Sequence, residues 1–169
     1  MEIEGFAQFV AVRYAELART AYLLTGSPHA AEDLVQSCLL KVMARWDEVD
    51  DPMAYLRRAM VNQRISLWRR LQRELLSARP PDTVASDPTG GLADRTTLVA
   101  ELARLPKQMR AVLVLRYFDD LSEAETAGVL GCSVGSVKSQ ASRGVARLRA
   151  LLSEPAETLE TPTVRRSGQ

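Results

Sequence analysis

Apolar residues recur every three or four positions through nearly every segment of this chain, and no segment alternates like a β-strand. The pattern predicts helices over about 4–24, 28–46, 51–76, 92–104, 106–118, 122–130 and 134–152. Gly26 ends the first of them, while Ser27–Pro28 and Asp51–Pro52 carry the cap-then-proline signal of a helix start. The predicted fold class is therefore all-α.

One internal stretch and the C-terminal tail break this pattern. Residues 77–91 read SARPPDTVASDPTGG, with three of the eight prolines of the chain and no apolar stripe. We expect a flexible linker here, which divides the chain into two small helical domains, 5–76 and 92–152. The polar tail, 153–169, is predicted to be disordered.

The sharpest local pattern lies in the second domain and is that of a helix-turn-helix. Ser122 and Glu125 have capping-box spacing, Gly131 stands where a turn needs a left-handed residue, and Ser133 precedes a longer basic helix. One face of the second helix is apolar and is expected to pack on apolar residues of the first, namely Leu121, Ala124, Val129 and Leu130. The residues of this face are Val134, Val137, Ala141, Val145 and Leu148. Gly144 is one of several small residues expected to let the helix approach DNA closely. The opposite face carries the candidate DNA-binding residues Ser136, Lys138, Ser139, Gln140, Arg143 and Arg147.

Charge supports this interpretation although the formal net charge is only +1. The cations are grouped: residues 53–73 hold six arginines and no acid, and residues 134–149 hold Lys138 and three arginines without an acid. Two basic stripes on a nearly neutral protein can attract a polyanion as well as a uniformly basic surface does.

The second predicted helix has two faces with apolar residues, one more than a small domain needs. The inner stripe is Leu34, Val35, Cys38, Leu39, Val42 and Trp46. The outer stripe surrounds Leu40 with Asp33, Gln36, Ser37 and Lys41. An apolar side chain inside a polar rim is typical of a protein-docking surface.

The third predicted helix combines arginines with Tyr55, Trp68 and Asn62. Arginine binds a phosphate backbone, whereas aromatic rings and asparagine can stack on or hydrogen-bond an unpaired base. Asparagine is a poor helix former, and apolar neighbours flank Asn62, so the residue is expected to have a polar task. Trp68 alone fits a hydrophobic core equally well.

Residues 31–70, AEDLVQSCLLKVMARWDEVDDPMAYLRRAMVNQRISLWRR, resemble region two of extracytoplasmic-function (ECF) sigma factors, and residues 105–149 resemble their region four. The opening RYAELARTAYLLTGSPHAAEDLVQ is similar to the actinobacterial SigE-like branch. The resemblance covers about 6–73 and 98–152, in the order of the family and with its linker length. Gln140 and Ser142 depart from the usual residues of the family, so the −35 sequence cannot be transferred. Thr126 replaces a more usual aliphatic residue in the scaffold helix, which is a small loss of core area.

The resemblance implies a DNA-templated transcription initiation factor that binds core RNA polymerase and promoter DNA, and leaves an anti-sigma factor open as a further partner. It assigns Asp33, Gln36, Ser37, Leu40 and Lys41 to the polymerase. It assigns Arg57, Arg58, Asn62, Arg69 and Arg70, with the loop 47–52, to the melted −10 element, and the aromatic Trp68 joins them as a DNA-binding candidate on its side-chain chemistry. It assigns Lys138 to phosphate, and Ser139, Gln140 and Arg143 to the groove of the −35 element.

Other classes have less support. The sequence offers no catalytic set around the single His29, no metal spacing for Cys38 and Cys132, and no apolar run of about 20 residues, so we expect no enzyme activity, no cofactor and no membrane insertion. The start of the chain lacks a signal-peptide pattern, which with two separated cysteines indicates the cytoplasm. A stand-alone helix-turn-helix regulator and a protein-binding helical module remain the alternatives.

Overall fold

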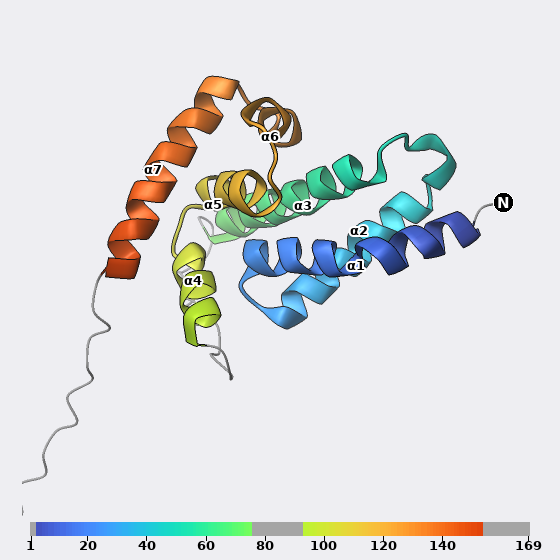
Figure 1. The fold of residues 1–169 in the computed structure, drawn as a ribbon, viewed down its shortest axis with the longest axis horizontal. Coiled ribbons are helices and arrows are strands. Elements are labelled where there is room, and N and C mark those ends of the chain that lie inside the picture. The colour runs from blue at the N-terminus through green and yellow to red at the C-terminus, as the bar shows by residue number, and fades with distance from the viewer. Residues whose placement is uncertain (1–2, 76–92, 154–169) are drawn as a thin grey trace, which may run out of the picture.

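The computed structural model describes residues 3–75 and 93–153, with side chains described over 4–66 and 97–153. Within these ranges every regular element is helical (Figure 1). The N-terminal half contains α1 (Ile3–Thr25), α2 (Pro28–Met43), the short turn η1 (Trp46–Glu48) and α3 (Pro52–Leu75). The C-terminal half contains α4 (Ala93–Ala103), α5 (Lys107–Leu113), the π-helical turn η2 (Val114–Phe118), α6 (Glu123–Leu130) and α7 (Val134–Ser153).

Local capping explains where most helices begin and end. The Ser27 hydroxyl accepts a hydrogen bond from the Ala30 amide, and the Asp51 carboxylate accepts one from the Ala54 amide. Gly26 and Gly131 take left-handed φ values of +79° and +65° at the ends of α1 and α6. The predicted linker, and the predicted tail apart from Ser153, lie outside the described residues.

The second helix ends earlier than its apolar stripe predicts. It stops at Met43, and Trp46 lies in η1 instead. The Trp46 ring packs against Phe6 and Phe9 of α1, each with a centroid distance of 5.3 Å. The chain therefore turns before Trp46, so the indole packs on the first turns of α1.

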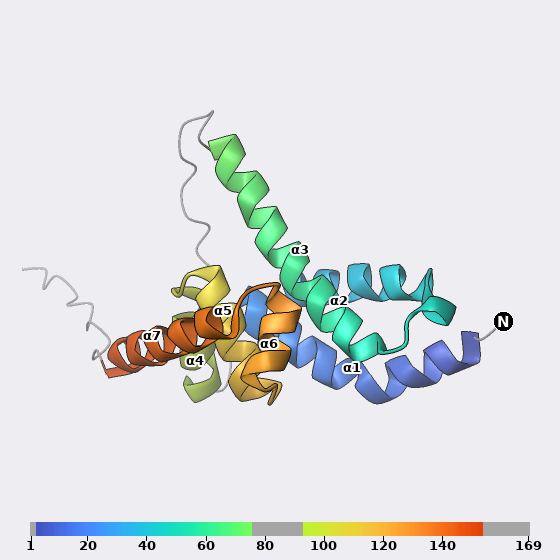
Figure 2. The ribbon, with the colours of Figure 1, turned by 90° about the horizontal axis from the view of Figure 1, so that it is seen from above.

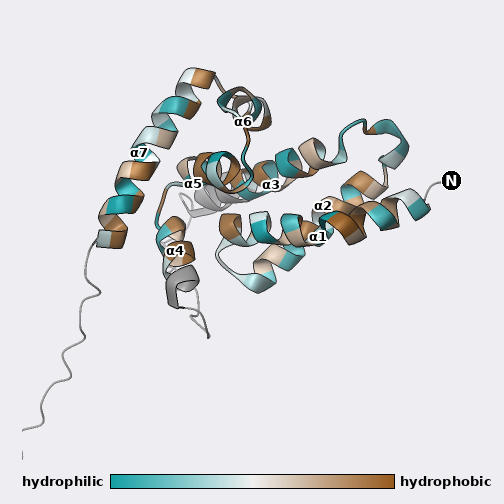
Figure 3. Cartoon of the chain, viewed as in Figure 1, coloured by the Kyte–Doolittle hydropathy of each residue, from teal (hydrophilic) through white to brown (hydrophobic). Residues whose placement is uncertain are grey.

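The helix-turn-helix has the predicted cap and turn but not all of the predicted packing. Both hydrogen bonds of the capping box between Ser122 and Glu125 are present. Val137 and Ala141 are buried with Val112 and Ala127, and they join α7 to α5 and α6. Hydrophobic and hydrophilic residues are interspersed along α7 (Figure 3).

Three expectations about this motif were wrong. Val134 is 40% exposed because it is the first residue of α7, and Ala124 is exposed because α6 buries its Thr126, Ala127 and Val129 instead. Gly144 does not face DNA, since a Cβ there would lie 2.9 Å from the Met109 side chain. It is the point of close approach between α7 and α5.

The two halves pack against each other. A single cluster of buried apolar side chains contains residues of both, including Leu17 and Leu24 of α1 with Leu102, Leu105 and Leu115 of the C-terminal half. Helix α1 contacts α4, α5 and η2, and α3 contacts α5 and α6. The C-terminal turns of α3 project away from the other helices (Figure 2).

The C-terminal end of α1 is satisfied by both halves. Within the helix end, the Gly26 amide donates to the Tyr22 carbonyl and the Thr25 hydroxyl to the Ala21 carbonyl. From outside, Arg110 of α5 donates to the Leu23 carbonyl at 2.6 Å, and Arg64 of α3 donates to the Leu24 carbonyl at 3.4 Å. The last carbonyls of a helix have no partner within it, so these two guanidinium groups complete α1.

Two buried threonines give opposite expectations for stability. Thr126 of α6 is 0% exposed and its hydroxyl has no hydrogen-bond partner, whereas the buried Thr20 hydroxyl donates to Asp119. Thr126→Val should raise the free energy of unfolding by about 1 kcal/mol, since it removes an unpaired buried hydroxyl. Thr20→Val should lower it by a similar amount. Urea denaturation measures both, and a loss of stability in Thr126→Val would contradict the unpaired state of its hydroxyl.

Candidate nucleic-acid and protein interfaces

The outer face of α2 presents an apolar centre with a polar rim. Leu40 is 62% exposed and Met43, one turn further, is 49% exposed. Gln36, Lys41 and Asp33 are exposed beside them. Met43 was not among the predicted docking residues, although its spacing from Gln36 and Leu40, seven and three positions, follows one helix face.

A hydrogen-bonded network ties this face to α3. The Lys41 ammonium donates to the Gln63 side-chain oxygen at 2.7 Å, and the Gln63 amide donates to the Ser37 hydroxyl at 2.8 Å. Ser37 donates in turn to the Leu34 carbonyl of its own helix. Gln63 therefore orients two residues of α2 from a neighbouring element, a role that the spacing along α2 alone does not reveal.

Arg57, predicted to contact DNA, is not on an open surface. Its side chain is 16% exposed and lies between two carboxylates. It donates to Glu16 of α1 at 2.7 Å and to Asp119, just after η2, at 3.4 Å. Arg57 is therefore held by one carboxylate from each half of the chain, and its role in binding a strand stays a prediction.

The other polar and aromatic side chains of α3 divide into three groups, of which Arg64 was not among the predicted site residues. Arg58 and Asn62 are exposed, as a role in binding a strand requires. Arg64 is turned to the end of α1, where burial lowers its pKa from the ordinary value. Trp68, Arg69 and Arg70 belong to α3, but their side chains lie outside the described residues.

A cationic cluster lies where Arg64 meets α5. Burial, together with Arg64, lowers the pKa of Arg110 to about 10. Burial and then the charges of Arg64 and Arg110 lower the pKa of Lys107 to about 8. The carbonyls at the negative end of the α1 dipole partly offset this concentration of positive charge.

The outer face of α7 carries the predicted DNA-reading residues. Ser136, Lys138, Ser139, Arg143 and Arg147 are exposed, and Gln140 is half-buried at the edge of the face. Arg143 donates to the Ser139 hydroxyl at 3.0 Å, so its guanidinium lies along the helix rather than extending from it. The Lys138 ammonium lies 3.7 Å from the Glu123 carboxylate of α6.

Two regions of the chain match known families. Residues 10–74 match the sigma-70 region 2 family, and residues 95–148 match the sigma-70 region 4 family. The chain is 40% identical over 152 residues to the RNA polymerase sigma-E factor of Streptomyces avermitilis, a match that covers 88% of this chain and 85% of the relative. It is 31% identical over 149 residues to the ECF RNA polymerase sigma factor SigL of Mycobacterium tuberculosis, covering 83% and 84%. The chain belongs to the ECF sigma factors.

Solved structures of sigma factors share this arrangement. The sigma factor RpoE from Bartonella quintana, in complex with the anti-sigma factor NepR, matches with a TM-score of 0.74 at 29% identity, over 89% of this chain and 98% of that one. CnrH, in complex with the cytosolic domain of CnrY, matches with a TM-score of 0.62 at 28% identity, over 88% of each chain. The first match spans both halves, so region four packs on region two in a similar way in the two proteins.

The described part of this sigma factor shows neither a membrane-spanning helix nor a group of metal ligands. None of the helices described has the length and apolar character needed to cross a bilayer. Nor do the described side chains include a group of three or more His, Cys, Asp or Glu residues that could hold a metal ion.

Proposed function

We propose that this sigma factor divides its work among three surfaces. The outer face of α2 binds core RNA polymerase, α3 with the loop 47–52 holds the melted −10 strand, and α7 reads the −35 element. Region two and region four then correspond to residues 5–76 and 92–152. The observation that carries this proposal is the outward placement of Leu40, Asn62 and Arg143 on three separate helices of a protein in this family.

The polymerase assignment rests on the composition of the α2 face. A leucine that is 62% exposed costs free energy in water and recovers it when a partner covers it. Its neighbour Met43 enlarges the apolar centre, and Asp33, Gln36 and Lys41 supply a polar rim. Interfaces of this kind concentrate their binding energy in a few central apolar side chains.

Leu40→Asp should weaken binding to core polymerase by about 30-fold or more, which corresponds to a hot-spot loss of about 2 kcal/mol. Val12→Asp is a matched control, since Val12 is 70% exposed on α1, outside the proposed surface. Affinity for purified core polymerase measures the effect. Equal losses for both variants would contradict docking through α2.

The hydrogen bonds of Gln63 with Lys41 and Ser37 should contribute to the affinity for core polymerase, although Gln63 lies outside the exposed apolar centre. Gln63→Leu removes both hydrogen bonds that orient Ser37 and Lys41, and should weaken polymerase binding about fivefold. Gln63→Glu keeps an acceptor for the Lys41 ammonium and should recover most of the affinity. If the leucine and glutamate variants bind alike, the network does not prepare the docking face.

The assignment of α7 to the −35 element rests on side-chain chemistry. A guanidinium can donate two hydrogen bonds to a guanine edge in the major groove, and short serines allow the helix to approach the bases. In the free protein, Arg143 is held along the helix by Ser139, so reading DNA requires it to change rotamer. Lys138, paired with Glu123, is suited to a phosphate rather than a base.

Arg143→Ala should reduce discrimination between the cognate and a scrambled −35 element by about 1–3 kcal/mol. Arg149→Ala removes the same charge from an exposed position on the same helix and should leave that discrimination unchanged. Competition binding of polymerase holoenzyme to the two promoter fragments gives both values. A uniform loss on both DNAs with Arg143→Ala would assign it to the phosphate backbone.

The assignment of α3 to the melted strand rests on its exposed Arg58 and Asn62 and on the family resemblance for Trp68, Arg69 and Arg70. Its C-terminal turns project from the body of the protein, where a strand can reach them (Figure 2). A stand-alone helix-turn-helix regulator would have no need of residues 10–74, which match region two.

The similar proteins also support proposals about the class of this protein, its location in the cell and its regulation. We infer that this protein is an initiation factor rather than an enzyme, that it acts in the cytoplasm, and that an anti-sigma factor regulates it. RpoE of Bartonella quintana and CnrH were each solved with a bound protein, and RpoE, whose partner is an anti-sigma factor, has both halves placed as in this chain. Co-purification with core polymerase, followed by promoter-specific transcription by the reconstituted holoenzyme, tests the function as a whole.

A further inference from the structure

The cationic cluster of Arg64, Lys107 and Arg110 joins the two regions at the end of α1. Arg64 comes from α3 of region two, whereas Lys107 and Arg110 come from α5 of region four and lie three positions apart on one helix face. Arg110 is 4% exposed, and Arg64 and Lys107 are half-buried. The cluster therefore requires region four to pack on region two as it does in this structure, an arrangement that we call the closed form.

The carbonyls of α1 use only part of the hydrogen-bonding capacity of the cluster. Arg110 donates to the Leu23 carbonyl and Arg64 to the Leu24 carbonyl, each through its Nε. A guanidinium has five N–H donors, so further donors remain on both side chains. Among the described residues, the buried Nη2 of Arg110 has no hydrogen-bond partner. The cluster can therefore accept additional anionic oxygens.

The positive charge of the cluster is not balanced by the protein around it. The end of a helix supplies about half a negative charge, against three unit charges. Burial lowers the pKa of all three groups, and positive neighbours in the cluster lower those of Lys107 and Arg110 further. No carboxylate of the described residues contributes to these shifts. A bound anion would relieve the repulsion.

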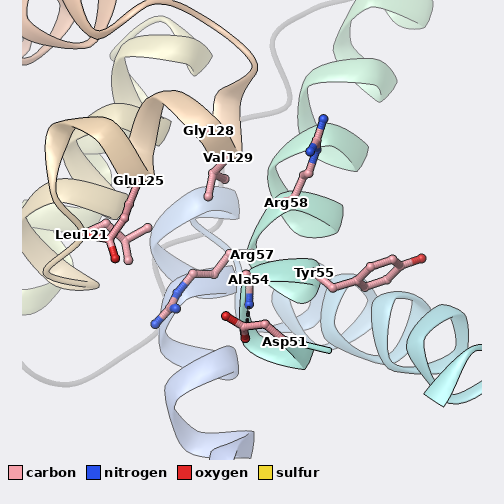
Figure 4. Close-up of a pocket in the computed structure, with 9 residues that line it drawn as sticks. All are labelled: Asp51, Ala54, Tyr55, Arg57, Arg58, Leu121, Glu125, Gly128 and Val129. Atoms are coloured by element: carbon pink, nitrogen blue, oxygen red, sulfur yellow. Dashed lines mark hydrogen bonds between the residues drawn. The ribbon is translucent and has the colours of Figure 1, made fainter. Parts of the chain in front are cut away.

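The arginines at the start of α3 have a different setting. A cleft of about 480 Å³ lies between the first turns of α3 and α6, and Arg57, Arg58, Asp51 and Glu125 are among the residues that line it (Figure 4). Two cations are thus accompanied by two carboxylates. This cleft has no excess charge that would select an anion, so the imbalance at Arg64 is a local property of the cluster.

Space for an anion lies beside Arg64. A hollow of about 330 Å³ is lined by Arg64, by Thr25 at the end of α1 and by the polar side chains of Ser37 and Gln63. Ligand pockets measure about 300–1,000 Å³, so this one suits a small ligand. Asp33 also lines the hollow, but its side chain is 68% exposed, so solvent screens its charge.

We propose that the cationic cluster binds a small phosphate-bearing anion, which enters the hollow beside Arg64 and holds the two regions together. A guanidinium suits phosphate because it can donate two parallel hydrogen bonds, and a lysine ammonium adds a point charge. Arg64 and Lys107, the partly accessible members, contact the ligand. Arg110 stays on the Leu23 carbonyl and contributes positive charge.

Such a ligand would regulate the shape of the protein. Because it contacts residues of both regions, it binds the closed form more tightly than a form in which the regions are apart, and it shifts the population toward the closed form. This site lies beyond the three surfaces of the proposed function and does not depend on them.

Thermal unfolding of the full chain, without polymerase or DNA, tests for the site. Inorganic phosphate or adenosine diphosphate at about 10 mM should raise the Tm by about 3–5 °C over sodium chloride of equal ionic strength, as expected for a ligand about tenfold above its Kd. A larger rise with the nucleotide would identify a phosphorylated metabolite as the ligand. An equal or larger rise with phosphate would identify the phosphoryl group itself. No rise with either would overturn the proposal.

Variants separate binding from the general stabilisation that phosphate gives by exclusion from protein surfaces. Lys107→Gln and Arg64→Gln should each lose most of the rise. Arg13→Gln is the matched control and should keep it, because the Arg13 side chain is 50% exposed on α1, about 18 Å before the end of that helix at 1.5 Å per residue. Equal rises in all three variants would overturn the site. If Arg64→Gln does not fold, Lys107→Gln decides the outcome alone.

Hydrogen exchange of backbone amides tests whether the ligand joins the two regions. Phosphate should slow exchange severalfold both at the end of α1 and in α5, and Lys107→Gln should remove both effects. Slowing confined to region two would overturn the bridging role. Failure here leaves the polymerase and DNA assignments intact, because their tests use other surfaces.

Discussion

The end of α1 is the point on which the arrangement of the whole molecule depends. Its Leu23 and Leu24 carbonyls cannot be satisfied within the helix, and Arg110 and Arg64 satisfy them from region four and from α3. Arg110 is itself 4% exposed, so its hydrogen bond to the Leu23 carbonyl is shielded from water, and separating the two regions would exchange that bond for bonds to water. The closed form is therefore held by polar contacts at positions fixed by geometry, in addition to the shared apolar core.

In this arrangement the faces of α2, α3 and α7 differ in how far their side chains are exposed and oriented for a partner. The α2 face is open and ordered by Gln63, so it can meet the polymerase as it stands. The face of α7 proposed to read DNA is exposed, but Arg143 lies along its own helix. On α3, Arg57 is covered whereas Asn62 is exposed. A protein whose polymerase-binding face is open and whose DNA-binding side chains are partly covered would bind core polymerase first and DNA afterwards.

Local sequence signals predicted what depends on local physics. Ser27, the Ser122–Glu125 pair and Gly131 were interpretable because caps and left-handed turns involve residues within a few positions of each other. The exposed Leu40 was also predicted, since polar neighbours at helical spacing surround it. Helix periodicity could not reveal the task of Arg57, which depends on Asp119, 62 residues further along the chain. Arg110 is separated from its acceptor Leu23 by 87 residues.

The packing errors have the same origin. Periodicity assigned Val134 to the core and Gly144 to the DNA side, but which turns of α7 are covered depends on where α5 crosses it. The early end of α2 followed from the pairing of Trp46 with Phe6 and Phe9 of α1. In each case a long-range contact overrides the local pattern.

The π-helical turn at Val114–Phe118 has a consequence for how this chain can vary. A π-helical turn holds one residue more than an α-helical turn, because its hydrogen bonds span five residues instead of four, so loss of a single residue here can be absorbed by reversion to an α-helical turn with Asp119 still directed at α1. The capped start of α6 at Ser122 lies beyond the turn and would form as before. The length of this turn can therefore vary by one residue while the contact of Asp119 with α1 and the capped start of α6 are both kept.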